Sequence, residues 1–472
     1  MRASVSFPKP VYAGLAQIAS ARNVSVAWVV RDAAENYVAE SIGPAATEQL
    51  GLALTPKRRQ RRTLAAGQLA GSTHRVAGLF AGIGGIELGL QRAGHHAALL
   101  CENDRAAQAV LRERFPGVPY HVDVTNLRRL PEGTSIVTAG FPCQDLSQAG
   151  ETKGIGGLRS GLVAEVFRLV KSSAVPWILL ENVPFMLQLG RGEAMNVITS
   201  ALEALGYRWA YRVVDSRAFG LPQRRRRVYL LASNVGDPRS VLFADETDDV
   251  PEKERDRTDV ACGFYWTEGL RGLGWAVDAV PTLKGGSTIG IPSPPAVLMP
   301  DGRIVTPHIE DAERLQGFPA GWTRPAEQCA KPSLRWKLVG NAVSVPAAVW
   351  IGRRLKKPGE CQKYNVRPIG SHRNWPTAAW NVGQGRFRVE ASEFPVRTNG
   401  RPLTEIIARR ATDLSPRATA GFLSRAEKAS LRFPSHFIPA VRAHLERVSS
   451  EPRHGRTRSE KVRKAHTKSH SR

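Results

Sequence analysis

An alternation of short apolar runs and longer amphipathic stretches, between Arg75 and about residue 235, most constrains what this chain can fold into. The apolar runs are RVAGLF, HAALLCE, SIVTAGF, WILLENV and RVYLLAS. Apolar strands joined by helices form mostly parallel, doubly wound sheets. Ligands of such sheets bind beyond the carboxyl ends of the strands. We therefore expect an α/β fold whose functional residues stand directly after these runs.

The net charge indicates a polyanionic partner. Lys and Arg total 67 against 42 Asp and Glu, a formal net charge of +25. The basic residues cluster in PKRRQRR (56–62) and in RHGRTRSEKVRKAHTKSHSR (453–472). Such segments add phosphate affinity that depends on salt and ignores base sequence. A solvated basic surface without a partner is the alternative.

Composition argues against several classes of protein. The longest apolar runs are far shorter than the roughly 20 residues of a membrane-spanning helix, and the first twenty residues lack the apolar core of a signal peptide. The five cysteines lie far apart without a C-x-x-C pair, which argues against a disulfide framework and a zinc site. We expect a cytoplasmic protein that binds neither metal nor membrane.

Residues 1–40 carry a pattern of their own. The alternation in RASVSFP predicts a strand that presents Arg2, Ser4 and Ser6 on one side, and two helical segments follow. This stretch resembles the ribbon-helix-helix family, in which two chains pair their strands. The resemblance implies a homodimer that inserts these three side chains into the major groove. A small helical appendage that only aids folding is the alternative. Residues 41–73, rich in Gly, Pro, Ala and Arg, predict a linker.

A glycine turn follows the first apolar run, in VAGLFAGIGGIELGL. Its glycines are Gly82, Gly84 and Gly85. Glycine lets the backbone approach a ligand closely, and Glu102 ends the next apolar run, where a carboxylate can accept hydrogen bonds from ribose hydroxyls. The spacing departs from G-x-G-x-x-G, which favours S-adenosylmethionine over a dinucleotide, with Asp123 available for the adenine amino group. A purely structural turn is the alternative.

Three further motifs stand beside the predicted strands. Cys143 lies in AGFPCQDLSQAG, Glu181 and Asn182 end WILLENV, and QRRRR precedes RVYLLAS. A lone cysteine is usually an ordinary buried thiol. However, the glycine turn, PCQ, ENV, Q-x-R-x-R, DAERLQGFP (311–319) and LVGNAVSVPAAVWIG (338–352) occur in the order typical of one family. The chain resembles the DNA cytosine-5 methyltransferases over roughly residues 75–355.

This resemblance implies a reaction. Cytosine C5 is too weak a nucleophile to take a methyl group until a thiolate has added to C6. Cys143 matches that nucleophile, and Glu181 matches the acid that holds N3. Arg225 and Arg227 match the residues that orient O2 and steady Glu181. The target cytosine must leave the duplex to react, by base flipping.

The resemblance also implies binding residues. The expected S-adenosylmethionine contacts are Phe80, stacked on the adenine, with Gly82, Gly84, Gly85, Glu102, Asp123, Pro142 and Asn341. A loop over residues 144–161 would close on the site, and its Ser147 and Arg159 would approach the DNA backbone. The segment 281–295 would reach the major groove, where Lys284, Ser287 and Thr288 could read base edges.

These inferences divide the chain into seven parts. They are a ribbon-helix-helix-like module (1–40), a linker (41–73), a cofactor-binding catalytic domain (74–235), a target-recognition region (236–308), a return to the catalytic domain (309–355), a region of unknown role (356–448) and a basic tail (449–472). We expect the S-adenosylmethionine-dependent methyltransferase fold and a DNA (cytosine-5)-methyltransferase acting on double-stranded DNA, in a restriction–modification system or alone. Three points stay open: a tRNA cytosine methylase with the same motifs, a repressor with a vestigial methylase domain, and a cognate restriction endonuclease as partner.

Overall fold

The computed structural model describes residues 7–22, 26, 29–30, 73–141, 161–249, 257–286, 294–370, 375–407 and 410–450. The chain forms two units, residues 1–65 and 66–472. Helix α1 (Lys9–Arg22) lies in the first unit, where a helix was predicted. The predicted strand with Arg2, Ser4 and Ser6 lies outside the described residues, so the ribbon-helix-helix interpretation remains a prediction.

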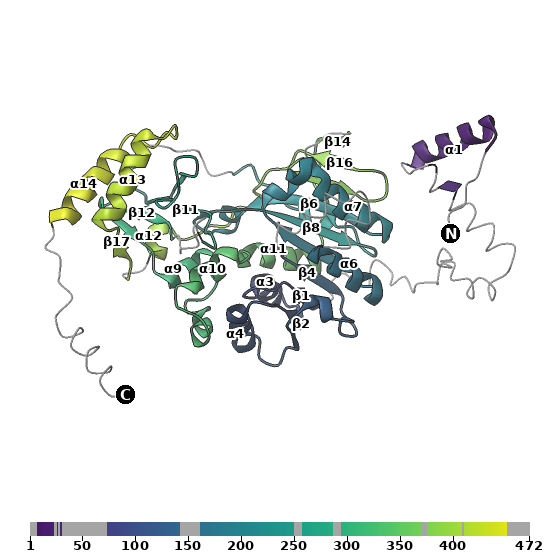
Figure 1. The fold of residues 1–472 in the computed structure, drawn as a ribbon, viewed down its shortest axis with the longest axis horizontal. Coiled ribbons are helices and arrows are strands. Elements are labelled where there is room, and N and C mark those ends of the chain that lie inside the picture. The colour runs from purple at the N-terminus through teal and green to yellow at the C-terminus, as the bar shows by residue number, and fades with distance from the viewer. Residues whose placement is uncertain are drawn as a thin grey trace, which may run out of the picture. The chain divides into compact units, whose positions relative to one another are not determined.

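A ten-stranded sheet forms the centre of the second unit, in the order β14-β16-β15-β6-β8-β5-β4-β1-β2-β3 (Figure 1). The strands are β1 (Arg75–Leu79), β2 (His96–Cys101), β3 (Tyr120–His121), β4 (Ile136–Ala139), β5 (Trp177–Asn182), β6 (Arg208–Asp215), β8 (Arg226–Ser233), β14 (Val366–Pro368), β15 (Ala378–Asn381) and β16 (Phe387–Val389). The pairs β1–β2, β1–β4, β2–β3 and β4–β5 are parallel. The predicted parallel sheet is therefore present.

Strand β8, the predicted run RVYLLAS, runs antiparallel to both of its neighbours, β5 and β6. The reason is the connection from β6 to β8, which spans only residues 216–225. A parallel neighbour needs a crossover of a dozen or more residues, usually with a helix. The short connection therefore turns β8 back along β6.

Helices cover both faces of this sheet (Figure 1). They are α3 (Gly85–Arg92), α4 (Arg105–Arg114), α6 (Leu162–Ser173), α7 (Glu193–Ala204), α8 (Arg239–Leu242) and α11 (Val345–Lys356). Alternate residues of β5 point to opposite faces. Ile178 and Leu180 belong to the buried cluster that contains α6 and α7, whereas Leu179 belongs to the cluster that contains α3 and α11. This is the doubly wound arrangement that the apolar runs predicted.

A second, antiparallel sheet has the order β10-β9-β12-β13-β17. Its strands are β9 (Cys262–Phe264), β10 (Trp275–Val277), β12 (Ala296–Leu298), β13 (Ile304–Thr306) and β17 (Thr412–Asp413), and the nearby helices are α9 (Ile309–Leu315), α10 (Leu334–Asn341), α12 (Leu403–Ile406), α13 (Pro416–Lys428) and α14 (Phe437–Ser450). Two short parallel strands, β7 (Gln223–Arg224) and β11 (Val280–Pro281), connect the two sheets. Among the described residues, no helix is long and apolar enough to cross a membrane.

Helix α3 carries a buried carboxyl group, that of Glu87. The Thr138 hydroxyl donates to Glu87 Oε1 at 2.7 Å, and Oε2 has no partner among the described atoms. Gly78 makes room for this side chain, because a Cβ at Gly78 would lie 2.4 Å from Glu87 Oε1. Burial raises the pKa of Glu87 from 4.5 to about 7. Between these two pH values Glu87 is therefore protonated in the folded protein and ionised in the unfolded chain.

This proton makes stability depend on pH. Between pH 4.5 and 7 the folded state binds more protons, so its free energy of unfolding falls as the pH rises. In the wild type this fall in the free energy of unfolding amounts to at most about 3 kcal/mol. We expect Glu87→Gln to lack it, because a neutral amide does not titrate and can keep the Thr138 hydrogen bond. Thermal unfolding of both proteins at pH 5.5 and pH 8 measures the difference. Parallel pH profiles would contradict the expectation.

Candidate active site

The strand ends gather the predicted residues at one edge of the large sheet. Leu79 pairs with Cys101 and Ala139, and Ala139 pairs with Leu180, so β1, β2, β4 and β5 end at the same level. The glycine turn follows β1, Glu102 follows β2, and Glu181 lies at the end of β5. The sequence pattern predicted this gathering correctly.

The glycine turn has the backbone that a close ligand requires. Phe80, Gly82 and Gly84 all have positive φ, at 53°, 55° and 80°. The Gly82 N–H donates to Glu102 Oε2 at 2.7 Å, and the Asp104 N–H donates to Oε1 at 2.9 Å. No atom lies within 4 Å of a Cβ built on Gly82. The backbone at Gly82 therefore faces open space beside a fixed carboxylate.

The other two glycines make room for protein atoms. A Cβ on Gly84 would lie 2.4 Å from the Phe115 ring, and one on Gly85 would lie 2.7 Å from the Val343 carbonyl oxygen. Close packing therefore explains these two glycines without a ligand.

Asp123 follows β3 at the same edge. Its carboxylate accepts the Thr125 N–H at 2.9 Å and so caps the short helix Val124–Asn126. This hydrogen bond is the main reason why the pKa of Asp123 is lowered. The residue has a local structural role and a position at the edge that is predicted to bind the cofactor.

Glu181 and Arg227 form a buried ion pair. Arg227 Nε lies 3.0 Å from Glu181 Oε1, and the two side chains are only 11% and 10% exposed. Burial raises the pKa of Glu181, although Arg227 and then Arg225 oppose the rise. The Glu181 carboxyl therefore holds a proton more readily than an exposed glutamate, which suits a group that must protonate a base.

The start of the cysteine-containing segment lies against this pair. A Cβ on Gly140 would come within 3.3 Å of Glu181 Oε2. Asn182 Nδ2 donates to the Phe141 carbonyl at 3.0 Å, so β5 fixes the chain two residues before Cys143. The sequence predicted no role for Asn182, and its place in the ENV triplet is the only sequence signal for this contact. Pro142, Cys143, Ser147 and Arg159 lie outside the described residues.

Arg225 has different contacts from Arg227. Its guanidinium is buried and donates to the carbonyls of Leu283, Gly340 and Ala342, at 3.0, 3.2 and 2.6 Å. It thereby connects Leu283, which follows β11, to the C-terminal end of α10. Burial lowers its pKa to about 9. The predicted contact between Arg225 and the cytosine remains a prediction, whereas the geometry gives this residue a structural role.

The predicted recognition segment packs against α10. A Cβ on Gly285 would lie 2.3 Å from Asn341 Oδ1, and one on Gly340 would lie 2.2 Å from the Lys284 carbonyl carbon. Lys284 Nζ lies 3.0 Å from Glu268 and 4.1 Å from the centre of the Tyr265 ring. Asn341 and Lys284 are thus brought together, while Ser287 and Thr288 lie outside the described residues.

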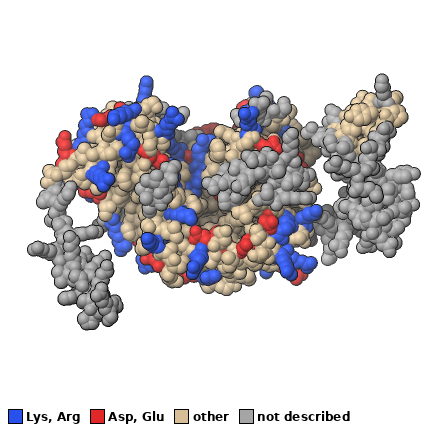
Figure 2. All heavy atoms as spheres, in the orientation of Figure 1, with Lys and Arg blue, Asp and Glu red and all other residues tan. Residues whose placement is uncertain are grey.

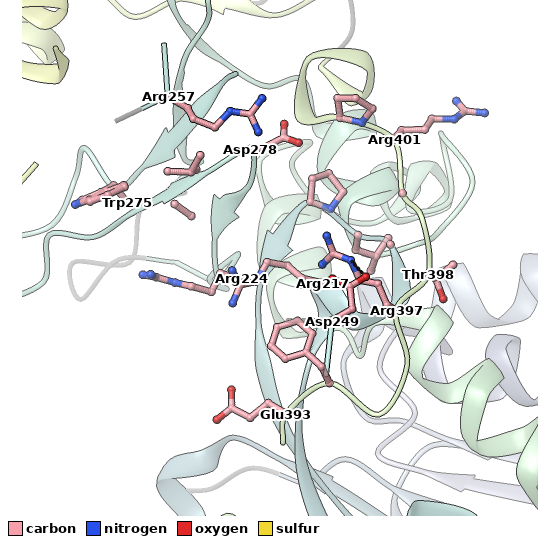
Figure 3. A pocket seen from close by; sticks show the side chains of 18 of the residues that line it. Arg217, Arg224, Asp249, Arg257, Trp275, Asp278, Glu393, Arg397, Thr398 and Arg401 are labelled. Carbon is pink, nitrogen blue, oxygen red and sulfur yellow. Dashed lines mark ion pairs between the residues drawn. The ribbon is translucent and has the colours of Figure 1, made fainter. Parts of the chain in front are cut away.

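A groove of about 1400 Å³ is lined in part by Arg224, the residue before Arg225 (Figure 3). It lies between residues 217–224, strand β10 and the segment 392–402. Its charged lining residues are Arg217, Arg224, Arg257, Arg397, Arg401 and Arg432, with Asp249, Asp278 and Glu393. Arg226, beside Arg227 in the chain, pairs with Glu393. Sequence reasoning gave these residues no role, although the excess of basic side chains visible in Figure 2 agrees with the net charge.

Comparison with known proteins assigns the chain to a family. Residues 74–268 match the sequence profile of the family described as C-5 cytosine-specific DNA methylase. The Type II methyltransferase M2.BsuMI of Bacillus subtilis (strain 168) is 47% identical over 381 residues, which are 78% of this chain and 97% of that protein. The Type II methyltransferase M.SsoII of Shigella sonnei is 27% identical over 60% of this chain and 80% of its own. The crystal structure of S. pombe Dnmt2 methyltransferase aligns with a TM-score of 0.44 at 17% identity, over 60% of this chain and 98% of that one.

Proposed function

This chain belongs to the C-5 cytosine-specific DNA methylase family, as a Type II DNA cytosine methyltransferase, and on that premise we propose that Glu181 and Arg227 hold the flipped cytosine. The observation that carries this proposal is their buried ion pair at the sheet edge, with the raised pKa of Glu181. A restriction–modification role fits the Type II relatives.

In the proposed methyl transfer, Cys143, Glu181 and Arg227 each have a separate role. The Cys143 thiolate adds to cytosine C6, and negative charge develops at N3. The protonated Glu181 carboxyl donates to N3 as that charge forms, and Arg227 stabilises the carboxylate that remains. The C5 carbon becomes electron-rich enough to take a methyl group. A base then removes the C5 proton, the Cys143 thiolate leaves C6, and N3 returns its proton to the Glu181 carboxylate, which restores the aromatic ring.

S-adenosylmethionine fits beside the glycine turn. The open space at Gly82, together with the half-buried carboxylate of Glu102, offers a close backbone approach and an acceptor for ribose hydroxyls. Phe80, Asp123, Pro142 and Asn341 complete the proposed contacts. The bound cofactor supplies the methyl group.

Duplex DNA would lie along the same edge of the sheet. Ser147 and Arg159 are proposed to contact its backbone, and Lys284, Ser287 and Thr288 are proposed to read base edges within the recognition region 236–308. A cytoplasmic location and a cognate restriction endonuclease follow as further proposals from the Type II relationship.

A methyl-transfer assay tests the proposed function. Purified protein is incubated with labelled S-adenosylmethionine and either duplex DNA or tRNA, and bisulfite sequencing then maps the modified cytosines. We expect label in the DNA alone, at one recurrent sequence. Label in the tRNA alone would support an RNA methylase, and DNA binding without label would support a repressor.

Residues 1–55 are proposed to dimerise the protein and bind its own promoter through Arg2, Ser4 and Ser6. Their removal should leave methylation of short duplexes intact, because the predicted catalytic residues lie in the other unit. Dimerisation, measured by sedimentation, and promoter binding, measured by gel shift, should both be lost. A truncated protein that remains dimeric and still shifts the promoter would contradict the regulatory role.

A further inference from the structure

Residues 403–450, to which the sequence gave no role, are built into the small sheet. Strand β17 pairs with β13, joining Asp413 to Val305 and Thr412 to Thr306. The Leu403 N–H donates to Asp278 Oδ1 at 2.9 Å. One sheet therefore contains strands from both the predicted recognition region and the chain's C-terminal region.

The two C-terminal helices supply the core of that sheet (Figure 1). The Phe264 ring on β9 lies 4.6 Å from Phe422 on α13 and 5.0 Å from Phe437 on α14, measured between ring centres, and all three rings are buried. His444 on α14 is also buried. Its Nδ1 accepts the Ile304 N–H at 3.1 Å, and its Nε2 lies 3.0 Å from the Leu414 carbonyl oxygen. Because a sheet must bury its apolar face, α13 and α14 complete the buried core on one side of strands β9, β12 and β13.

Helix α13 also fixes the loop between β9 and β10. Arg425 Nη2 donates to the Trp266 carbonyl at 2.6 Å, and the Trp266 indole donates to the Pro294 carbonyl at 2.9 Å. A chain of two hydrogen bonds thus runs from α13 through the loop to Pro294, near the end of the segment 281–295. Trp275, at the other end of the loop, donates its indole N–H to the Arg432 carbonyl at 3.0 Å.

The loop in turn holds the one described side chain that is proposed to read bases. Glu268 pairs with Lys284, and Tyr265 lies beneath its ammonium group. The Tyr265 hydroxyl donates to the Thr282 carbonyl at 2.6 Å. The position of Lys284 therefore depends on a loop that both C-terminal contacts anchor.

We propose that residues 403–450 are the second half of the target-recognition domain, with Arg425 as a positioning residue for the base-reading segment. Hydrogen bonds to base edges demand placement within about 0.5 Å, so side chains must be held by a supporting layer. Arg425, Trp266 and Pro294 form that layer. The inference rests on the proposed function, since it assumes that the segment 281–295 reads DNA.

Substitution of Arg425 tests the inference. The measurement compares the methylation rate at the mapped site with the rate on duplexes that have one base pair changed. We expect Arg425→Met to reduce this ratio by about tenfold, because a displaced reading segment loses much of the penalty that a mismatched base pair normally carries. S-adenosylmethionine affinity and the melting temperature should stay near the wild-type values. Arg425→Lys, which keeps a donor, should restore part of the ratio. Arg442→Met on α14 removes an equal charge from an exposed pair with Glu427 and should leave the ratio unchanged.

A second variant covers the case in which Arg425→Met fails to fold. Trp275→Phe keeps an aromatic ring but removes the donor to the Arg432 carbonyl, and it should also lower the ratio. The inference is overturned if the Arg425→Met protein folds and discriminates as well as the wild type. If Arg425→Met is unstable, the same result for a folded Trp275→Phe protein overturns it. Wild-type protein that labels no DNA would instead refute the proposed function, so the two failures are distinct.

Discussion

Cys143→Ser should abolish methyl transfer, by roughly 10⁴-fold or more, while the protein still binds duplex DNA and S-adenosylmethionine. A serine hydroxyl is almost fully protonated at neutral pH and cannot add to cytosine C6 as a thiolate does. Transfer of label from the cofactor to duplex DNA measures the loss, and a gel shift measures binding. Turnover near the wild-type rate would refute the covalent mechanism.

A trapping experiment checks the same step in the unaltered protein. In the presence of S-adenosylmethionine, duplex DNA with 5-fluorocytosine at the target should form a stable adduct at Cys143. After methyl transfer the fluorine cannot leave C5 as a proton does, so the thiolate is not expelled. Mass spectrometry of the digested adduct identifies the residue. Cys361→Ser is a matched control, since Cys361 lies outside the candidate site, in the chain that follows α11, and this variant should be trapped as the wild type is. An adduct on another cysteine would assign the nucleophile elsewhere.

Glu181→Gln should slow methyl transfer by about 10²- to 10⁴-fold, the usual loss for a positioned acid. Glutamine can still donate a hydrogen bond to N3 but has no proton to transfer. Burial raises the pKa of Glu181, so the wild-type rate should fall as the pH rises through that pKa, and the variant should lack this fall. Single-turnover rates between pH 5.5 and pH 8.5 measure both effects.

The matched control for this variant is Glu102→Gln. Glu102 accepts two backbone N–H groups at the glycine turn, so its amide variant should weaken cofactor binding with less effect on the chemical step. Isothermal titration with S-adenosylmethionine separates the two residues. A large loss of cofactor affinity in Glu181→Gln would place Glu181 in the cofactor site instead.

The gathering of Glu102 and Glu181 could be predicted from sequence because it follows from local patterns. Each carboxylate ends an apolar run, and parallel strands place their carboxyl ends together. Strand β6 was missed because RWAYRVVD interrupts its apolar residues with two arginines. Arg212, one of them, is fully buried and donates to the carbonyls of Leu242 and Asp245. Arg212 also pairs with the Glu246 carboxylate, and a charge satisfied by such distant groups leaves no sign in the local sequence.

The contacts of Arg225 and the pairing of β17 with the small sheet could not be predicted for a related reason. Arg225 bonds to carbonyls 58 to 117 residues away, and nothing in QRRRR separates this arginine from Arg227. Strand β17 has only two residues, too few for a periodic pattern. Both features depend on pairings between distant parts of the chain, which periodicity does not encode.

The small sheet combines strands that lie far apart in the sequence, and this determines the order in which parts of the enzyme can fold during synthesis on the ribosome. Thr306 on β13 and its neighbour Thr412 are 106 residues apart, and ribosomes add roughly 5–20 residues per second. The apolar face around Phe264 therefore stays uncovered for several seconds before α13 and α14 have been synthesised. Strands β14 to β16 are synthesised in this interval. On the proposed role of residues 403–450, a nascent chain completes the strands around its cofactor site before it completes its recognition domain, so selective modification would begin only after α14 has been synthesised.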